Sequence, residues 1–122
     1  MSIPLRPLTN HDLTYYAKRL GIPYFRGVFM RDSMPVGPPH RYESAIVNLD
    51  SSSGTGTHWV CYKKRGNKVY YFDSFGDLRP PADLVRYFGP RADIQYNYDC
   101  QQSVDSVICG HLCLKFLSNV LP

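Results

Sequence analysis

The chain has 122 residues, 43% of them apolar, and a formal net charge of +4 at pH 7. That length suits one hydrophobic core and is too short for two ordinary domains, so we expect a single domain over residues 1–122. The apolar runs are shorter than the roughly eighteen residues that a membrane-spanning helix needs. The first residues lack the pattern of a secretory signal, so we expect an intracellular protein with no membrane partner.

The first element that the sequence predicts is a helix within residues 9–23. Thr9 or Asn10 can cap its start, and Gly21 followed by Pro23 ends it. The apolar face of this helix would carry Leu13, Tyr16, Ala17 and Leu20.

Loops and one strand follow the helix. Consecutive prolines place a loop at residues 36–41, because proline lacks a backbone donor and restricts its neighbours. Residues 44–50 predict a short apolar strand, and serines and glycines indicate a flexible loop at 51–57.

A β-hairpin is the clearest prediction from the middle of the chain. Residues 58–64 and 68–75 are rich in β-branched and aromatic side chains and flank a turn at Gly66. His58 begins the first arm and Asp73 lies near the end of the second. Antiparallel pairing about the turn therefore brings His58 and Asp73 side by side.

The last third of the chain predicts a helix, a strand and a second helix. Residues 80–89 begin with prolines and end with glycine, which is typical of a short helix. Residues 92–98 resemble a strand, and residues 105–121 a helix that is apolar nearly all round. We expect this final helix to lie at the buried centre of the fold.

The four cysteines are expected to be free thiols, since nothing in the sequence points to secretion. They form no CxxC pair, and this spacing argues against structural zinc, so we expect no metal and no other cofactor. The basic cluster Lys63–Lys68 is interpreted as a solvated hairpin tip. The alternative interpretation is a patch that binds nucleic acid or an acidic partner.

Cys109 is the candidate nucleophile. It lies near the start of the last helix, where the helix dipole and a nearby imidazolium favour the thiolate, although a buried cysteine is more often a small apolar residue. Gly110 next to it indicates a close approach of the backbone to another group, because glycine costs helix stability. His58 is the candidate base and Asp73 the group that orients it.

The oxyanion that forms during attack by Cys109 also needs donors. Gln102 precedes the helix and can supply its amide together with the backbone N–H of Cys109. Gln101 stands beside it and is an alternative donor.

Two stretches, GTHWVCYKKRGNKVYYFDSFG and QQSVDSVICGHLCLKFL, resemble the adenain-like and SUMO-protease-like cysteine peptidases. The order of His, Asp, Gln and Cys is that of the family. Ile108 precedes Cys109, whereas the SUMO-directed branch usually has Asp there, and Gln102 lies seven places before Cys109, as in adenain. The adenain branch is therefore favoured.

The resemblance implies an α+β fold of the papain-like, adenain type, with a small mixed or antiparallel sheet packed on a central helix that bears the nucleophile. It implies catalytic roles for His58, Asp73, Cys109 and Gln102, and a substrate-binding role for Trp59, which matches the tryptophan after the histidine.

The activity that the resemblance implies is that of an endopeptidase acting on viral or mobile-element precursor proteins. A ubiquitin-like-protein isopeptidase is the alternative enzyme, and an inactive module that binds peptide or nucleic acid is the alternative outside enzymes. The implied partners are a protein or peptide substrate and a peptide or DNA activator. The implied location is the host cytoplasm or nucleus, or the virion. The sequence gives no indication of oligomeric state.

Overall fold

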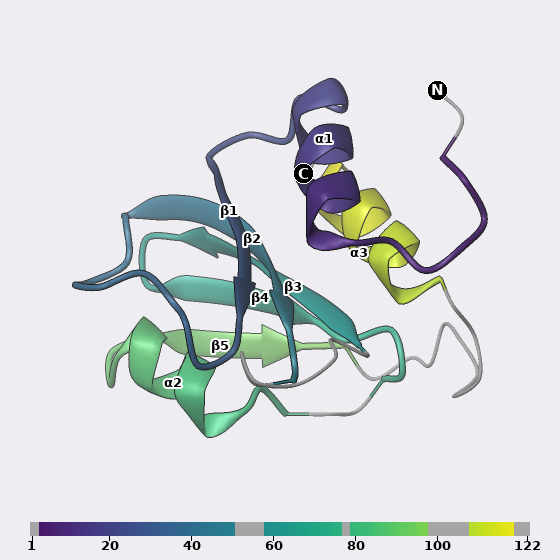
Figure 1. Ribbon diagram of the computed structural model, residues 1–122. Helices are drawn as coiled ribbons and strands as arrows, with labels where there is room; N and C mark the ends of the chain where they lie inside the picture. The colour runs from purple at the N-terminus through teal and green to yellow at the C-terminus, as the bar shows by residue number, and fades with distance from the viewer. Residues whose placement is uncertain (1–2, 51–57, 77–78, 98–107, 119–122) are drawn as a thin grey trace.

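The computed structural model describes residues 3–50, 58–76, 79–97 and 108–118, which form three layers (Figure 1). A five-stranded sheet is the middle layer. Two helices, α1 (Asn10–Arg19) and α3 (Cys109–Ser118), cover one face, and α2 (Ala82–Phe88) covers the other. The mixed α and β composition confirms the fold class expected from the sequence.

The sheet is mixed, with its strands in chain order from one edge to the other. The strands are β1 (Phe25–Met30), β2 (Tyr42–Asn48), β3 (Trp59–Arg65), β4 (Lys68–Phe72) and β5 (Asp93–Tyr96). The two outer pairs, β1 with β2 and β4 with β5, are parallel, and the two inner pairs are antiparallel. A parallel pair needs a crossover, and α2 provides it between β4 and β5.

The hairpin of β3 and β4 has the register that the sequence predicts. Arg65 pairs with Lys68 next to the turn, and Cys61 pairs with Phe72 near the open end. Gly66 has a φ of +64°, a left-handed conformation that glycine adopts without steric cost. This register places the start of β3 beside the end of β4, where His58 and Asp73 lie.

Helix α1 begins with a capping box that resolves the choice between two predicted caps. The Thr9 hydroxyl accepts from the Asp12 N–H at 3.1 Å, and the Asp12 carboxylate accepts from the Thr9 N–H at 2.9 Å. Leu13 and Ala17 are buried as predicted, whereas Leu20, the C-cap residue, is exposed.

Helix α3 packs on the sheet beside α1, on the same face. Its buried residues are Cys109, Gly110, Cys113, Leu114 and Leu117. Lys115 and Ser118 are exposed, so the helix covers one face of the sheet and is not enclosed on all sides.

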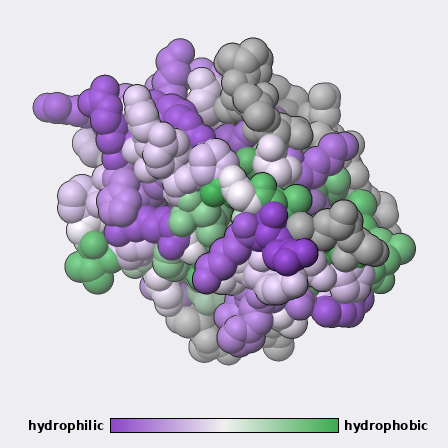
Figure 2. All heavy atoms as spheres, turned by 90° about the horizontal axis from the view of Figure 1, so that it is seen from above, coloured by the Kyte–Doolittle hydropathy of each residue, from purple (hydrophilic) through white to green (hydrophobic). Residues whose placement is uncertain are grey.

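Figure 2 shows the surface of the molecule seen from above, relative to the view of Figure 1. On this face the apolar side chains lie in small separate patches among polar ones.

The interpretation of Lys63–Lys68 as a solvated tip is wrong for its first two residues. Lys63 is 2% exposed, and its ammonium group lies 4.7 Å from the centre of the Phe116 ring. Lys64 is buried too, and its Nζ donates to the His40 carbonyl at 2.9 Å. Both lysines bury their aliphatic stems along the sheet while the charged ends reach partners.

Strand β1 is a further difference, because the sequence analysis predicts no element there. Gly27 interrupts the strand, and the register of β1 against β2 shifts between Phe25 and Gly27. No helix in the described part of the chain is long and apolar enough to cross a membrane.

Candidate active site

His58 and Asp73 form a hydrogen-bonded pair at the open end of the hairpin. His58 Nε2 lies 2.8 Å from Asp73 Oδ1. The side chains are 11% and 1% exposed, so the pair is largely shielded from water. The hairpin register predicts this adjacency, because His58 directly precedes β3 and Asp73 directly follows β4.

The backbone of Asp73 is held in place by Asn97. The Asp73 N–H donates to Asn97 Oδ1 at 2.9 Å, and Asn97 Nδ2 donates to the Asp73 carbonyl at 2.7 Å. Asp73 Oδ1 also accepts from the Phe75 N–H at 3.0 Å. Asn97 is not among the site residues predicted from the sequence. The position of Asn97 directly after β5 could have indicated this contact, because the parallel strands β4 and β5 end at the same edge of the sheet.

Phe75 is a second site residue that the sequence analysis missed. Its ring stacks on the His58 imidazole, with centroids 4.1 Å apart and an angle of 6° between the planes. One face of the imidazole is therefore covered by an apolar ring. Together with the bond to Asp73, this contact fixes the orientation of the base.

Cys109 is the first residue of α3, and its thiol lies against the start of β3. The backbone N–H of Trp59 donates to Cys109 Sγ at 3.5 Å. The thiol and the His58 imidazole also interact, because each shifts the pKa of the other. Since Nε2 of His58 is bound to Asp73, the nitrogen left for the thiol is Nδ1. The three side chains thus form the series Cys109, His58, Asp73.

The thiol and the imidazole shift each other's pKa in opposite directions. Burial favours the neutral imidazole, but the hydrogen bonds to Asp73 and Cys109 outweigh it and raise the pKa of His58 to about 9. Burial likewise favours the neutral thiol, but hydrogen bonds from His58 and from the Trp59 N–H lower the pKa of Cys109 below its ordinary value. These shifts favour a thiolate paired with an imidazolium, the reactive form of a nucleophilic cysteine.

Gly110 has the close neighbours that the sequence predicts. A Cβ at Gly110 would lie 3.2 Å from Leu13 Cδ2 and 3.4 Å from the Leu8 side chain. The close approach is therefore to α1 and the segment before it. This packing brings the start of α3 close to the N-terminal residues.

Trp59 is 7% exposed and belongs to the core between the sheet and α3. Its substrate contact stays a prediction, as do the catalytic roles of the other site residues. Gln102 and its alternative Gln101 lie outside the residues that the structure describes.

A hollow of about 500 Å³ lies beside Asp73. Its other lining residues come from the ends of β1 and β2 and from the segment that leads into α2: Arg31, Leu49, Arg79, Pro81, Ala82 and Asp83. Within residues 3–50, 58–76, 79–97 and 108–118, no group of three His, Cys, Asp or Glu side chains is placed to hold a metal ion.

Two crystal structures of the pS273R protease of ASFV, one of them of the Se-Met protein, are similar to this chain. Their TM-scores are 0.63 and 0.58, at 17% and 18% sequence identity. Each match covers 94% of this chain but only 57% and 58% of the protease chains, so the chain spans less than three fifths of their length. At this identity the likeness shows the fold. No protein-family model and no curated protein matches the sequence.

Proposed function

We propose that the protein is a cysteine peptidase in which Cys109 is the nucleophile, His58 the general acid and base, and Asp73 the group that orients His58. The observation that carries this proposal is the His58 imidazole, which is hydrogen-bonded to the buried Asp73 carboxylate and shifts the pKa of the Cys109 thiol at the start of α3. The likeness in fold to pS273R protease supports it.

The proposed reaction begins with attack of the Cys109 thiolate on the carbonyl carbon of a peptide bond, which forms a C–S bond and an oxyanion. The backbone N–H of Cys109 and an amide of Gln102 are the proposed donors to that oxyanion. As the C–N bond breaks, the His58 imidazolium gives its proton to the leaving amine. A water molecule then attacks the thioester and gives its proton to His58, and the product carboxylic acid leaves as the thiolate is restored.

The proposed substrates are precursor proteins of a virus or mobile element, as expected for the adenain branch. The similar solved structures are of a protease from ASFV, which supports a viral setting. The alternative substrate is a ubiquitin-like conjugate. An inactive binding module is less favoured, because the pKa shifts of Cys109 and His58 are those that a working nucleophile and base require.

The test combines a covalent probe with a cleavage assay. The purified protein is treated with a peptide vinyl sulfone and, separately, with a ubiquitin-like protein that carries a C-terminal electrophile, and the adduct is located by mass spectrometry. We expect an adduct of the peptide probe on Cys109, none with Cys109→Ala, and cleavage products from a mixed peptide library. Reaction with only the ubiquitin-like probe would replace the endopeptidase by the isopeptidase. Failure of both probes and of cleavage would refute a peptidase.

A further inference from the structure

Trp59 contacts both α3 and the N-terminal residues, and it directly follows His58 in the chain. We propose that Trp59 is a positioning residue. Its side chain is held by residues 3–8, here called the N-terminal strap, and its backbone thereby holds the Cys109 thiol in place. This inference rests on the proposed function and gives Trp59 a role other than contact with substrate.

The backbone of Trp59 contacts α3 at two successive turns. Its N–H donates to Cys109 Sγ at 3.5 Å, and its carbonyl accepts from Cys113 Sγ at 3.5 Å. Cys109 and Cys113 are one turn apart and face the same strand. The peptide groups on both sides of Trp59 therefore set the distance between β3 and the start of α3.

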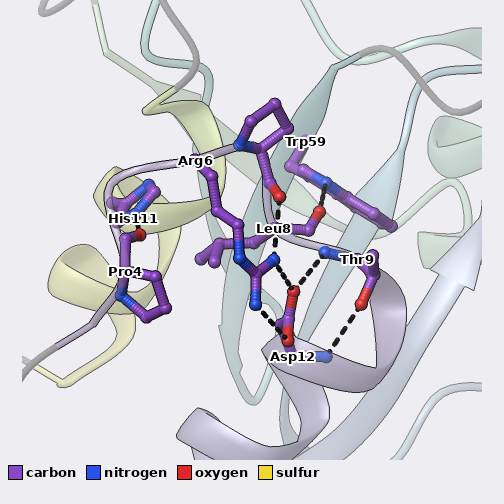
Figure 3. A network of polar contacts seen from close by, with 8 residues as sticks. Pro4, Arg6, Leu8, Thr9, Asp12, Trp59 and His111 are labelled. Atoms are coloured by element: carbon purple, nitrogen blue, oxygen red, sulfur yellow. Dashed lines mark hydrogen bonds and ion pairs between the residues drawn. The ribbon is translucent and has the colours of Figure 1, made fainter.

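The side chain of Trp59 contacts the strap. Indole Nε1 donates to the Leu8 carbonyl at 2.9 Å, and both residues are buried (Figure 3). Among the hydrogen bonds between described residues, this is the one that the Leu8 carbonyl accepts. A buried carbonyl that loses its donor is costly, so the bond holds the indole in one orientation.

The strap is itself fixed to α3 just after the nucleophile. The Leu8 side chain lies against Gly110, and His111 Nε2 lies 2.7 Å from the Pro4 carbonyl. The Arg6 guanidinium binds the Asp12 carboxylate at 2.7 and 3.3 Å and so ties the strap to α1 (Figure 3). The strap thus contacts the two residues that follow Cys109, and Trp59 contacts Cys109 itself.

These contacts form a closed path from the strap through the indole to the Trp59 peptide, then to Cys109 and back to the strap through Gly110. If the indole loses its anchor, the Trp59 N–H moves relative to Sγ, and the adjacent His58 moves with it. A displacement of about 1 Å in a reacting group is enough to cost on the order of a hundredfold in rate. A residue that acts in this way affects kcat, whereas a residue that binds substrate uniformly affects KM.

The test is the pH dependence of alkylation at Cys109, which needs no substrate. Trp59→Phe keeps an aromatic ring and removes the indole N–H. We expect the pH midpoint for alkylation of Cys109 by iodoacetamide to rise by about one unit, because the thiolate loses a well-placed donor. His111→Leu removes the donor to the Pro4 carbonyl and should shift the midpoint in the same direction by less.

The control is Leu84→Ala, which opens a cavity in the core between the sheet and α2, on the side away from Cys109. It should lower the thermal midpoint at least as much as Trp59→Phe and leave the alkylation midpoint unchanged. If Trp59→Phe does not fold, the comparison of His111→Leu with Leu84→Ala decides the question.

An unchanged alkylation midpoint in Trp59→Phe, or in a folded His111→Leu where Trp59→Phe is lost, would overturn the inference. So would a peptidase in which Trp59→Phe raises KM while kcat is retained, because that result indicates substrate contact. A shifted midpoint in a protein that cleaves nothing would support the positioning role and refute the peptidase, so the two failures are distinguishable.

Discussion

His58 and Cys109 shift each other's pKa in opposite directions, and Asp73 Oδ1 lies 2.8 Å from His58 Nε2. Such a group of residues can be predicted from the sequence when strand pairing in a hairpin fixes which positions lie side by side. His58 and Asp73 qualify because one hairpin with a defined turn brings them together. Asn97 and Phe75 do not qualify, because their contacts depend on β5 joining the sheet edge and on the path of the chain after Asp73.

The proposed ion pair of the Cys109 thiolate and the His58 imidazolium predicts a bell-shaped dependence of kcat/KM on pH. Activity should appear below the pKa of an ordinary thiol, as the thiolate forms, and should fall near pH 9, as His58 loses the proton that it gives to the leaving group. Asp73→Asn removes the carboxylate that raises the pKa of His58, so the alkaline limb should move to lower pH and turnover should fall about a hundredfold. Rates of peptide cleavage between pH 4 and 10 give both limbs. Wild-type turnover in a well-folded Asp73→Asn protein would be evidence against its orienting role.

The oxyanion donor is tested by two neighbouring substitutions. If Gln102 donates to the oxyanion, Gln102→Ala should lower kcat by roughly a hundredfold to a thousandfold, the range found for one such donor in another protease, with little change in KM. Gln101→Ala is the matched control and should cost far less if the segment is extended, because neighbours on an extended segment point in opposite directions. Steady-state kinetics measure both. A reversed order would assign the donor to Gln101, and intact kcat in both variants would exclude the two glutamines.

At the scale of elements, prediction succeeded where local signals agree. The helix at Asn10–Arg19 has a capping residue, an apolar face and a glycine stop, and the hairpin has β-branched arms and a glycine turn. Strand β1 lacks such signals, because all six of its residues are half-buried and Gly27 interrupts it. The buried state of Lys63 was missed because its partner ring, Phe116, belongs to a helix far along the chain.

The hairpin turn predicts a measurable effect on stability. Gly66 has a φ of +64° and open space around it, so Gly66→Ala should lower the free energy of unfolding by about 1–2 kcal/mol through backbone strain alone. Gly66→Asn is the matched control and should cost less, because asparagine adopts the left-handed conformation more readily. Urea denaturation gives both values. Equal losses for the two substitutions would show that conformation at this turn is not the cause.

At the scale of the whole molecule, a buried acidic group joins the layers on the side away from Cys109. Glu43 on β2 accepts hydrogen bonds from Arg26 on β1, Tyr62 on β3 and Tyr87 on α2. Burial opposes its charge, but these bonds and the one from the His40 N–H prevail and lower the pKa of Glu43. No local sequence pattern predicts this arrangement, since its members come from four separate elements.

The lowered pKa of Glu43 predicts loss of stability in acid. A carboxyl group whose pKa is lower in the folded state contributes stability above its unfolded value of about 4.5, and this contribution is lost as pH falls through the folded value. Glu43→Gln should therefore be less stable at pH 7 and lose less on acidification below pH 4.5. Urea midpoints between pH 3 and 7 test this, with Asp93→Asn, at an exposed position on β5, as the control. If the urea midpoints of wild type and Glu43→Gln fall by the same amount between pH 7 and pH 3, the loss of stability in acid does not come from Glu43.

The three-layer fold places the start of α3 and the open end of the hairpin together, and the proposed chemistry depends on that meeting. The most direct measurement is competitive alkylation of the native protein with iodoacetamide at mildly acidic pH, with the modified cysteines identified by mass spectrometry. Cys109 should react well before Cys61, Cys100 and Cys113, because its neighbours lower its pKa below that of an ordinary thiol. His58→Ala should abolish that preference. Equal labelling of all four cysteines in the folded wild-type protein, or a preference that survives His58→Ala, would contradict the assignment of Cys109 and His58 as nucleophile and base.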